Sequence, residues 1–132
     1  MNAISSSSQL DSTETLALTL PPIVERRILA VIVKQQKELS RHFTPAELSQ
    51  EVHLSGSQLQ ALFSKTVGMP LAQFTKQMRL TVARHLFVTE FLTVGEVMTR
   101  VGFHDKSHFT HDFKKAYGIS PGKFRQQYLK GK

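Results

Sequence analysis

The sequence contains no cysteine and no tryptophan among its 132 residues, and no apolar run long enough to cross a bilayer. Without cysteine there is no disulfide, no thiolate metal site and no cysteine nucleophile, which is compatible with a reducing cytosol. The first 22 residues lack a basic segment followed by an apolar one, so we expect no secretory signal.

Acidic residues are also few. The chain has 10 Asp and Glu against 17 Lys and Arg, for a net charge of +7. Asp11 and Glu14 are the only charged residues among the first 22, so the positive charge belongs to the remainder. A small, strongly basic domain most often binds a polyanion, either nucleic acid or an anionic membrane. The basic residues are spread over several predicted helices and form no single amphipathic stripe. The pattern therefore gives little support to a membrane surface as the partner.

Residues 1–21 are rich in Ser and Thr, and we expect a disordered tail or linker there. Pro21 and Pro22 mark a boundary, after which apolar residues recur at helical spacing without sustained period-two alternation. Helix starts are predicted near Thr44, Pro70, Thr93 and Ser120. The sequence therefore predicts an all-α fold of about seven helices.

Two segments about 50 residues apart repeat the same pattern. Leu48 and Val52 correspond to Val97 and Val101. After a one-residue insertion, a further four positions correspond: Leu59, Phe63, Gly68 and Phe74 match Phe109, Phe113, Gly118 and Phe124. Each copy reads as a helix, a tight turn, a second helix and a terminating glycine. Two helix-turn-helix units in a basic chain indicate DNA binding.

The second copy, "VGEVMTRVGFHDKSHFTHDFKKAYGISPGKFR", resembles the signature of the AraC/XylS family of bacterial transcription regulators. The resemblance covers about residues 22–129. It implies a first subdomain at 22–69, a linker helix at 70–88 and a second subdomain at 89–132. In this family the linker helix, here about 27 Å long, holds two recognition helices in successive major grooves about 34 Å apart. A monomer can thereby read two half-sites.

Helical geometry predicts which side chains of each recognition helix face outward. In the first helix Leu59, Leu62, Phe63 and Val67 are expected inside, and in the second Phe109, Phe113 and Ala116. The outward positions match those that similar regulators use to read bases: Ser57, Gln60, Ala61, Lys106, Ser107, Thr110 and His111. Gln60 suits adenine, Lys106 guanine and Thr110 a thymine methyl group. Ala61 departs from the arginine that is frequent in the family, so we expect the first half to read more weakly.

Phosphate contacts are expected from a second set of residues, which carries no sequence information and makes binding salt-dependent. The set is Ser64, Lys65, Lys76, Arg79, Lys114, Lys115, Lys123 and Arg125. For each lysine the alternative is a solubilising surface charge that contacts no phosphate. Arg84 and Arg100 are as well suited to pairing within the protein as to contacting phosphate.

His104, His108 and His111 lie within eight positions and would share helix faces in pairs. A metal site is disfavoured because there is no cysteine and no second ligand cluster. Under the fold prediction the three need not converge, and His111 is expected to donate to a base or phosphate. A histidine side chain ordinarily gains a proton near pH 6.5, which would tighten such a contact.

The sequence thus predicts a sequence-specific regulator of transcription that binds double-stranded DNA as a monomer, without cofactor or metal. The family's usual behaviour implies an activator that contacts RNA polymerase, in the cytoplasm at the bacterial nucleoid. No enzyme is expected: the related DNA-repair methyltransferases need methyl-accepting cysteines. Alternatives are a non-specific architectural DNA-binding protein and the DNA-binding fragment of a larger ligand-sensing regulator. Met1 and the N-terminal tail favour a complete single-domain regulator over a fragment.

Overall fold

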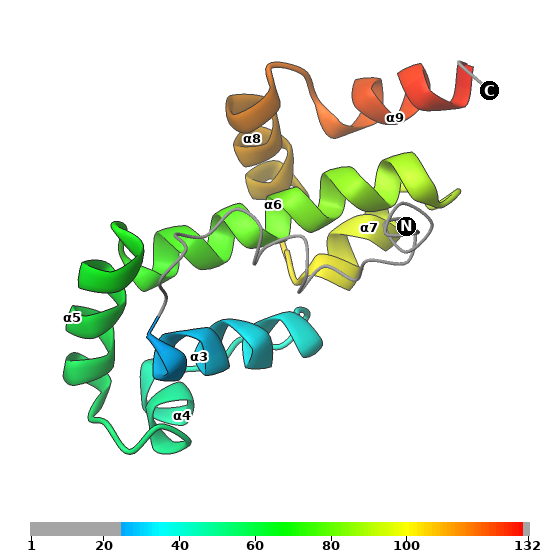
Figure 1. Cartoon of the computed structure of the whole chain (residues 1–132). Helices are drawn as coiled ribbons and strands as arrows, with labels where there is room; N and C mark the ends of the chain where they lie inside the picture. Colours follow the sequence, from blue (N-terminus) through cyan, green and yellow to red (C-terminus); the bar gives the residue numbers. More distant parts are fainter. Residues whose placement is uncertain (1–24, 131–132) are drawn as a thin grey trace, which may run out of the picture. The chain divides into compact units, whose positions relative to one another are not determined.

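The computed structural model describes residues 25–130, and all regular structure in that range is helical (Figure 1). Pro21, Pro22 and Val24, together with the predicted tail at 1–21, lie outside the described residues. Seven helices follow one another within the described residues: α3 (Arg26–Lys37), α4 (Pro45–Gln50), α5 (Gly56–Val67), α6 (Leu71–Thr89), α7 (Val94–Val101), α8 (Lys106–Tyr117) and α9 (Pro121–Lys130). The predicted all-α fold is confirmed. The central helix, expected over 70–88, begins and ends one residue later.

The chain forms two compact units. The first comprises residues 25–38 and Phe43–Phe74, and the second comprises Leu39–His42 and residues 75–130. The helix α6 therefore contributes its first residues to one unit and the rest to the other. The short segment Leu39–His42 belongs to the second unit although it connects α3 with α4 of the first.

The first unit packs α3, α4 and α5 around one apolar core. The helix α3 buries Ile28, Val31 and Ile32, and α5 buries Leu59 and Phe63. The ring of Phe63 meets that of Phe74 edge-on at 5.4 Å between centroids. Both Leu59 and Phe63 are fully inaccessible, which orients α5 about its axis.

The second unit repeats this arrangement with a more aromatic core. Phe113 of α8 is fully buried and lies 5.8 Å from Phe87, 5.5 Å from Phe124 and 4.8 Å from Tyr117. Phe109, one turn earlier, is also fully buried. Aromatic rings in such tilted and edge-on geometries stabilise a core beyond the area they bury.

Local capping sets where these helices begin. The Thr44 hydroxyl accepts a hydrogen bond from the Glu47 amide, and the Glu47 carboxylate accepts from the Thr44 amide, so the two residues form a capping box at the predicted helix start. Thr93 and Glu96 form the equivalent box on α7. The side chains of Ser55 and Asp105 cap α5 and α8. Each cap satisfies amide groups that a helix start would otherwise leave unpaired.

The turn of each helix-turn-helix needs one residue in the left-handed region. Gly102 has φ +92°, and an added Cβ would lie 2.7 Å from the Leu39 carbonyl oxygen. Gly118 lies outside the turn, at the end of α8. Its φ is +84°, but an added Cβ there would meet nothing within 4 Å. The two glycines therefore share a conformation but differ in what surrounds them.

We expect Gly102→Ala to lower the free energy of unfolding more than Gly118→Ala. Both substitutions force alanine into the left-handed region, at about 1–2 kcal/mol. Only Gly102→Ala adds an overlap with the Leu39 carbonyl, which costs about 1–3 kcal/mol further. Urea denaturation followed by circular dichroism measures both, and equal losses would show that the Leu39 segment moves aside freely.

Candidate nucleic-acid interface

The two helix-turn-helix turns have the same backbone hydrogen bonds. In the first, the Leu54 amide donates to the Ser49 carbonyl at 3.2 Å. In the second, the Phe103 amide donates to the Met98 carbonyl at 3.0 Å. Such a bond spanning six residues is the closing bond of a Schellman turn. His104, which follows Phe103, is the additional residue of the second turn, so the insertion seen in the sequence repeat lies there.

The left-handed position of the first turn is occupied by His53, with φ 58°. It corresponds to Gly102 in the repeat, and its amide donates to the Gln50 carbonyl at 3.4 Å. Its side chain is exposed. Sequence reasoning missed this conformation, because a histidine is not a residue that usually signals positive φ.

The helix α5 presents its predicted outward residues to solvent. The exposed set is Ser57, Gln60, Ala61, Ser64 and Lys65. Leu59 and Phe63 are fully buried on the opposite side, while Leu62 and Val67 are half-buried. The exposed face of α5 is therefore polar apart from Ala61, and it carries a single positive charge.

The helix α8 presents a corresponding face. Lys106, Ser107, His111 and Lys114 are exposed, and Thr110 is half-buried. Four of these residues line one surface depression of about 440 Å³: Lys106, Ser107, Thr110 and His111. The structure thus brings together all the base-reading residues predicted on α8.

The prediction that Ala116 faces inward is wrong, because this residue is exposed. The inner stripe of α8 instead continues from Phe113 to Tyr117, whose rings are 4.8 Å apart. Residues four apart share a helix face, so an inward Tyr117 leaves Ala116 turned to solvent.

The residues predicted to contact phosphate divide into two groups. Ser64, Lys65, Lys114, Lys115 and Lys123 are exposed. The other three have partners within the protein, which sequence reasoning did not anticipate, although Lys76 is exposed as well. Arg79 Nε donates to the Leu39 carbonyl at 3.4 Å, Arg125 Nε donates to the Leu92 carbonyl at 2.7 Å, and Lys76 Nζ lies 3.7 Å from Asp112 Oδ2.

Arg79 holds the Leu39–His42 segment against the rest of the second unit. Its Nη2 also donates to the Arg41 carbonyl at 3.3 Å, and burial lowers the pKa of its guanidinium. Arg84 and Arg100 also have internal partners, as the sequence allowed. Arg84 lies over the Tyr117 ring at 5.3 Å, and Arg100 Nη1 is 3.3 Å from Glu90 Oε1.

The three clustered histidines do not converge on one point. His111 lines the depression on α8, whereas His104 and His108 line a separate cavity beside His42. The His42 and His104 rings are 4.8 Å apart, and His42 Nε2 donates to the Gly102 carbonyl at 2.7 Å. Residues 25–130 contain no group of three or more His, Asp or Glu arranged to hold a metal ion.

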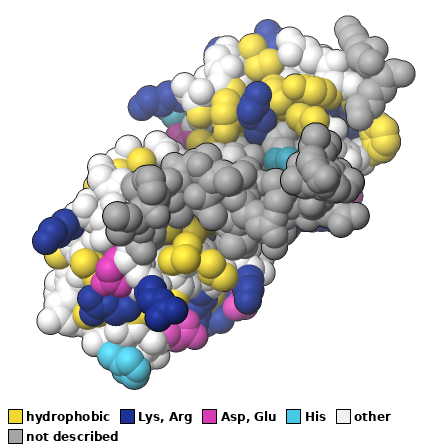
Figure 2. Space-filling view, in the orientation of Figure 1, with side chains coloured by type: hydrophobic (Ala, Val, Ile, Leu, Met, Phe, Trp, Pro, Cys, Tyr) yellow, Lys and Arg dark blue, Asp and Glu magenta, His cyan; other side chains and the backbone are white. Residues whose placement is uncertain are grey.

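Basic side chains occur on both units in the face that Figure 2 shows, with acidic side chains beside some of them. Hydrogen bonds at helix starts lower the pKa of two carboxylates. The Asp105 carboxylate accepts from the His108 amide at 3.0 Å, and Glu96 accepts from the Thr93 amide at 2.8 Å. Within the described range, no helix has the length and apolar character needed to cross a membrane.

Comparison with protein families matches residues 48–127 to a model described as a helix-turn-helix domain. The chain is 34% identical over 77 residues to the HTH-type transcriptional activator RhaR of Pectobacterium atrosepticum, covering 58% of this chain and 27% of that protein. It is 36% identical over 84 residues to the arabinose operon regulatory protein of Salmonella typhimurium, covering 64% and 30%. The chain therefore spans less than a third of the length of these relatives.

Solved structures share the fold. The C-terminal domain of the response regulator yesN from Fusobacterium nucleatum is 31% identical, with a TM-score of 0.65 and coverage of 72% of this chain and 93% of that one. The DNA-binding domain of the global transcriptional factor AdpA, solved with a target DNA, is 23% identical. Its TM-score is 0.73, with coverage of 80% and 96%. At that identity the second match supports the fold alone.

We expect Asp105→Ala to lower the Tm at neutral pH by a few degrees, because α8 loses its N-terminal cap. The folded-state pKa of Asp105 lies below its ordinary value of 3.8. The stabilisation is therefore fully present above pH 3.8 and is lost as pH falls through the folded-state pKa. The Tm difference from wild type should narrow below pH 3.8. Asp105→Asn, which keeps an uncharged cap, is the control, and a gap that stays constant down to pH 3 would contradict the expectation.

Proposed function

The chain belongs to the AraC/XylS family of helix-turn-helix transcription regulators, and we propose that it reads specific sequences in double-stranded DNA with α5 and α8. The observation that carries this proposal is the duplicated reading element. Both helices have 12 residues, follow a turn with the same hydrogen bonds and end at a left-handed glycine. Both bury two large apolar side chains and expose a polar face.

The polar faces suit the major groove, where each base pair presents a distinct set of donors and acceptors. Gln60 can bond bidentately to adenine, and Lys106 can donate to guanine N7 and O6. Thr110 offers a hydroxyl and a methyl group. The base-reading set is then Ser57, Gln60 and Ala61 on α5, with Lys106, Ser107, Thr110 and His111 on α8. Since Ala61 can contact only a thymine methyl group, α8 is the stronger reader.

Phosphate contacts come mainly from the exposed set Ser64, Lys65, Lys114, Lys115 and Lys123. Arg79 and Arg125 direct their Nε groups to carbonyl oxygens of this chain, so their first role is structural. Lys76 has a carboxylate neighbour on α8, which reduces its charge at the DNA. The exposed lysines supply affinity that falls as salt rises.

The wider role follows from the relatives, two of which are named as an activator and an operon regulator. We propose that this protein activates transcription, contacts RNA polymerase and binds DNA as a monomer through its two reading helices. It acts at the nucleoid in the cytoplasm, and catalyses no reaction. The family is one of DNA-binding regulators and not of enzymes.

The competing function is non-specific architectural binding. It would use the same basic surface but would show uniform affinity across sequences and a complete loss of binding with salt. The polar, varied composition of the α8 face favours the specific reader, because phosphate binding alone requires only positive charge.

Selection from a random duplex library near physiological salt tests the proposal. We expect two short motifs about one helical turn apart.

Lys106→Ala should relax the preference at one base position and lose about 1–3 kcal/mol of discrimination there. Lys114→Ala, about two turns further along α8, is the control; it should weaken binding to all sequences alike and reduce the salt slope by about 1. The proposal would be replaced by non-specific architectural binding if the selection enriched no motif, or if Lys106→Ala lost equal affinity for matched and scrambled DNA.

We expect His111→Ala to weaken binding to the selected DNA, because the imidazole N–H can donate to a base or a phosphate and alanine cannot. Fluorescence anisotropy at fixed pH and salt measures the loss. An affinity of His111→Ala equal to that of wild type would contradict the role.

A further inference from the structure

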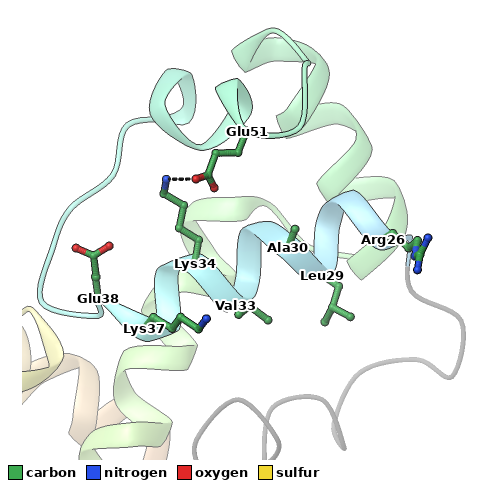
Figure 3. Close-up of a pocket in the computed structure, with 8 residues that line it drawn as sticks. All are labelled: Arg26, Leu29, Ala30, Val33, Lys34, Lys37, Glu38 and Glu51. Atoms are coloured by element: carbon green, nitrogen blue, oxygen red, sulfur yellow. Dashed lines mark ion pairs between the residues drawn. The ribbon is translucent and has the colours of Figure 1, made fainter.

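The Leu39–His42 segment lies against the turn that precedes α8. In Figure 3 the chain passes from Glu38, at the end of α3, into a loop that leads to α4, and the segment is part of this loop. An added Cβ at Gly102 would lie 2.7 Å from the Leu39 carbonyl oxygen. The same Cβ would lie 3.0 Å from Arg79 Nε of α6. The segment, α6 and the turn therefore meet at Gly102, all within the second unit.

Both ends of the segment are hydrogen-bonded. At its start, Arg79 Nε donates to the Leu39 carbonyl at 3.4 Å, and Arg79 Nη2 donates to the Arg41 carbonyl at 3.3 Å. At its end, His42 Nε2 donates to the Gly102 carbonyl at 2.7 Å. A carbonyl oxygen can only accept, so Nε2 of His42 carries the hydrogen. The segment is thus held to α6 by one side chain and holds the turn by another.

The turn that the segment contacts leads directly to the reading residues of α8. The ring of His104, two residues after Gly102, lies 4.8 Å from that of His42. Asp105 follows and caps α8, which begins at Lys106. Only three residues separate Gly102 from Lys106, so a shift of the turn shifts the start of α8 with it. Side chains that bond to specific base atoms must be held to within about 0.5 Å of the productive geometry.

We propose that the Leu39–His42 segment positions the start of α8 for base reading, with Arg79 and His42 as the positioning residues. The proposal rests on the proposed function, because it concerns the same reading helix. Arg79 anchors the segment to α6, and its guanidinium has the planar set of donors needed to bond two carbonyls at once. His42 carries the constraint to the Gly102 carbonyl.

The first turn provides an internal comparison. It closes with the bond from the Leu54 amide to the Ser49 carbonyl, as the second closes with the bond from the Phe103 amide to the Met98 carbonyl. Its left-handed position is taken by His53, whose side chain is exposed. The Leu54 and Phe103 amides therefore report the opening of two matched turns, of which the second is the one that the segment contacts.

Hydrogen exchange of the full chain without DNA, measured by NMR, tests whether the segment holds the turn. His42→Ala should speed exchange of the Phe103 amide about fivefold, because a turn that has lost a hydrogen bond opens more often. The Leu54 amide should keep its rate, and so should the amide of the buried Phe113, which reports opening of the second unit as a whole.

Two further variants separate the hydrogen bond from the loss of a ring. His42→Gln, whose side-chain amide can donate from nearly the same place as Nε2, should restore most of the protection of the Phe103 amide. His85→Ala removes another exposed imidazole from the second unit, on α6, and should leave all three exchange rates unchanged.

Binding to matched and scrambled DNA tests the consequence for reading. The ratio of the two affinities should fall about threefold to tenfold in His42→Ala and recover in His42→Gln. Arg79→Lys keeps the charge but loses the planar donors, so it should lower the same ratio. Its affinity for scrambled DNA and its salt slope should stay those of wild type, because no phosphate contact is lost.

Three results would overturn the proposal. Unchanged Phe103 exchange in His42→Ala would show that the segment does not hold the turn. Equal acceleration of the Phe103 and Phe113 amides would show that His42 stabilises the whole unit without positioning the turn. An unchanged affinity ratio in His42→Ala, beside a wild type that discriminates, would remove the role in reading. A wild type that does not discriminate would overturn the proposed function, while the exchange rates, measured without DNA, still decide whether the segment holds the turn.

Discussion

Complete burial of two large apolar side chains on each reading helix is the constraint on which the rest of the structure depends. Leu59 and Phe63 anchor α5, and Phe109 and Phe113 anchor α8. Burying a side chain of this size stabilises the fold by about 1.5–3 kcal/mol. A rotation of either helix about its axis would give up that stabilisation. The polar residues between the anchors are therefore held outward. The exposed polar face of each helix is therefore a consequence of the core.

The two turns show how one backbone requirement is met under different surroundings. Both turns close with the same six-residue hydrogen bond, and both place one residue at positive φ. In the second turn the Leu39 carbonyl approaches so closely that only glycine fits at position 102. The first turn accepts His53, whose side chain is exposed. The Leu39–His42 segment explains the difference, and Arg79 holds that segment by two carbonyl bonds.

The charges of the chain serve two purposes that composition cannot separate. Lys65, Lys114, Lys115 and Lys123 are exposed and available to a polyanion, whereas Arg79 and Arg125 bond to carbonyl oxygens of this chain. A guanidinium has several donors in a fixed plane, so it can satisfy a carbonyl that no backbone amide reaches. The net charge therefore overstates the positive charge that is available to DNA. Most of the available charge is on the exposed lysines.

The sequence by itself determined the all-α fold, four of the helix starts to within a residue, and most of the inner and outer faces of α5 and α8. These properties depend on residues within one or two turns of each other. Thr44 with Glu47, or Phe109 with Phe113, can therefore be recognised from spacing alone. Only the tertiary structure decided the partners of Arg79, Arg125 and His42, which lie 33 to 60 positions away along the chain. It also decided that Tyr117 and not Ala116 continues the inner face of α8, because the aromatic cluster around Phe113 has room for a ring there. Helical periodicity allows either residue; packing between distant segments selects one.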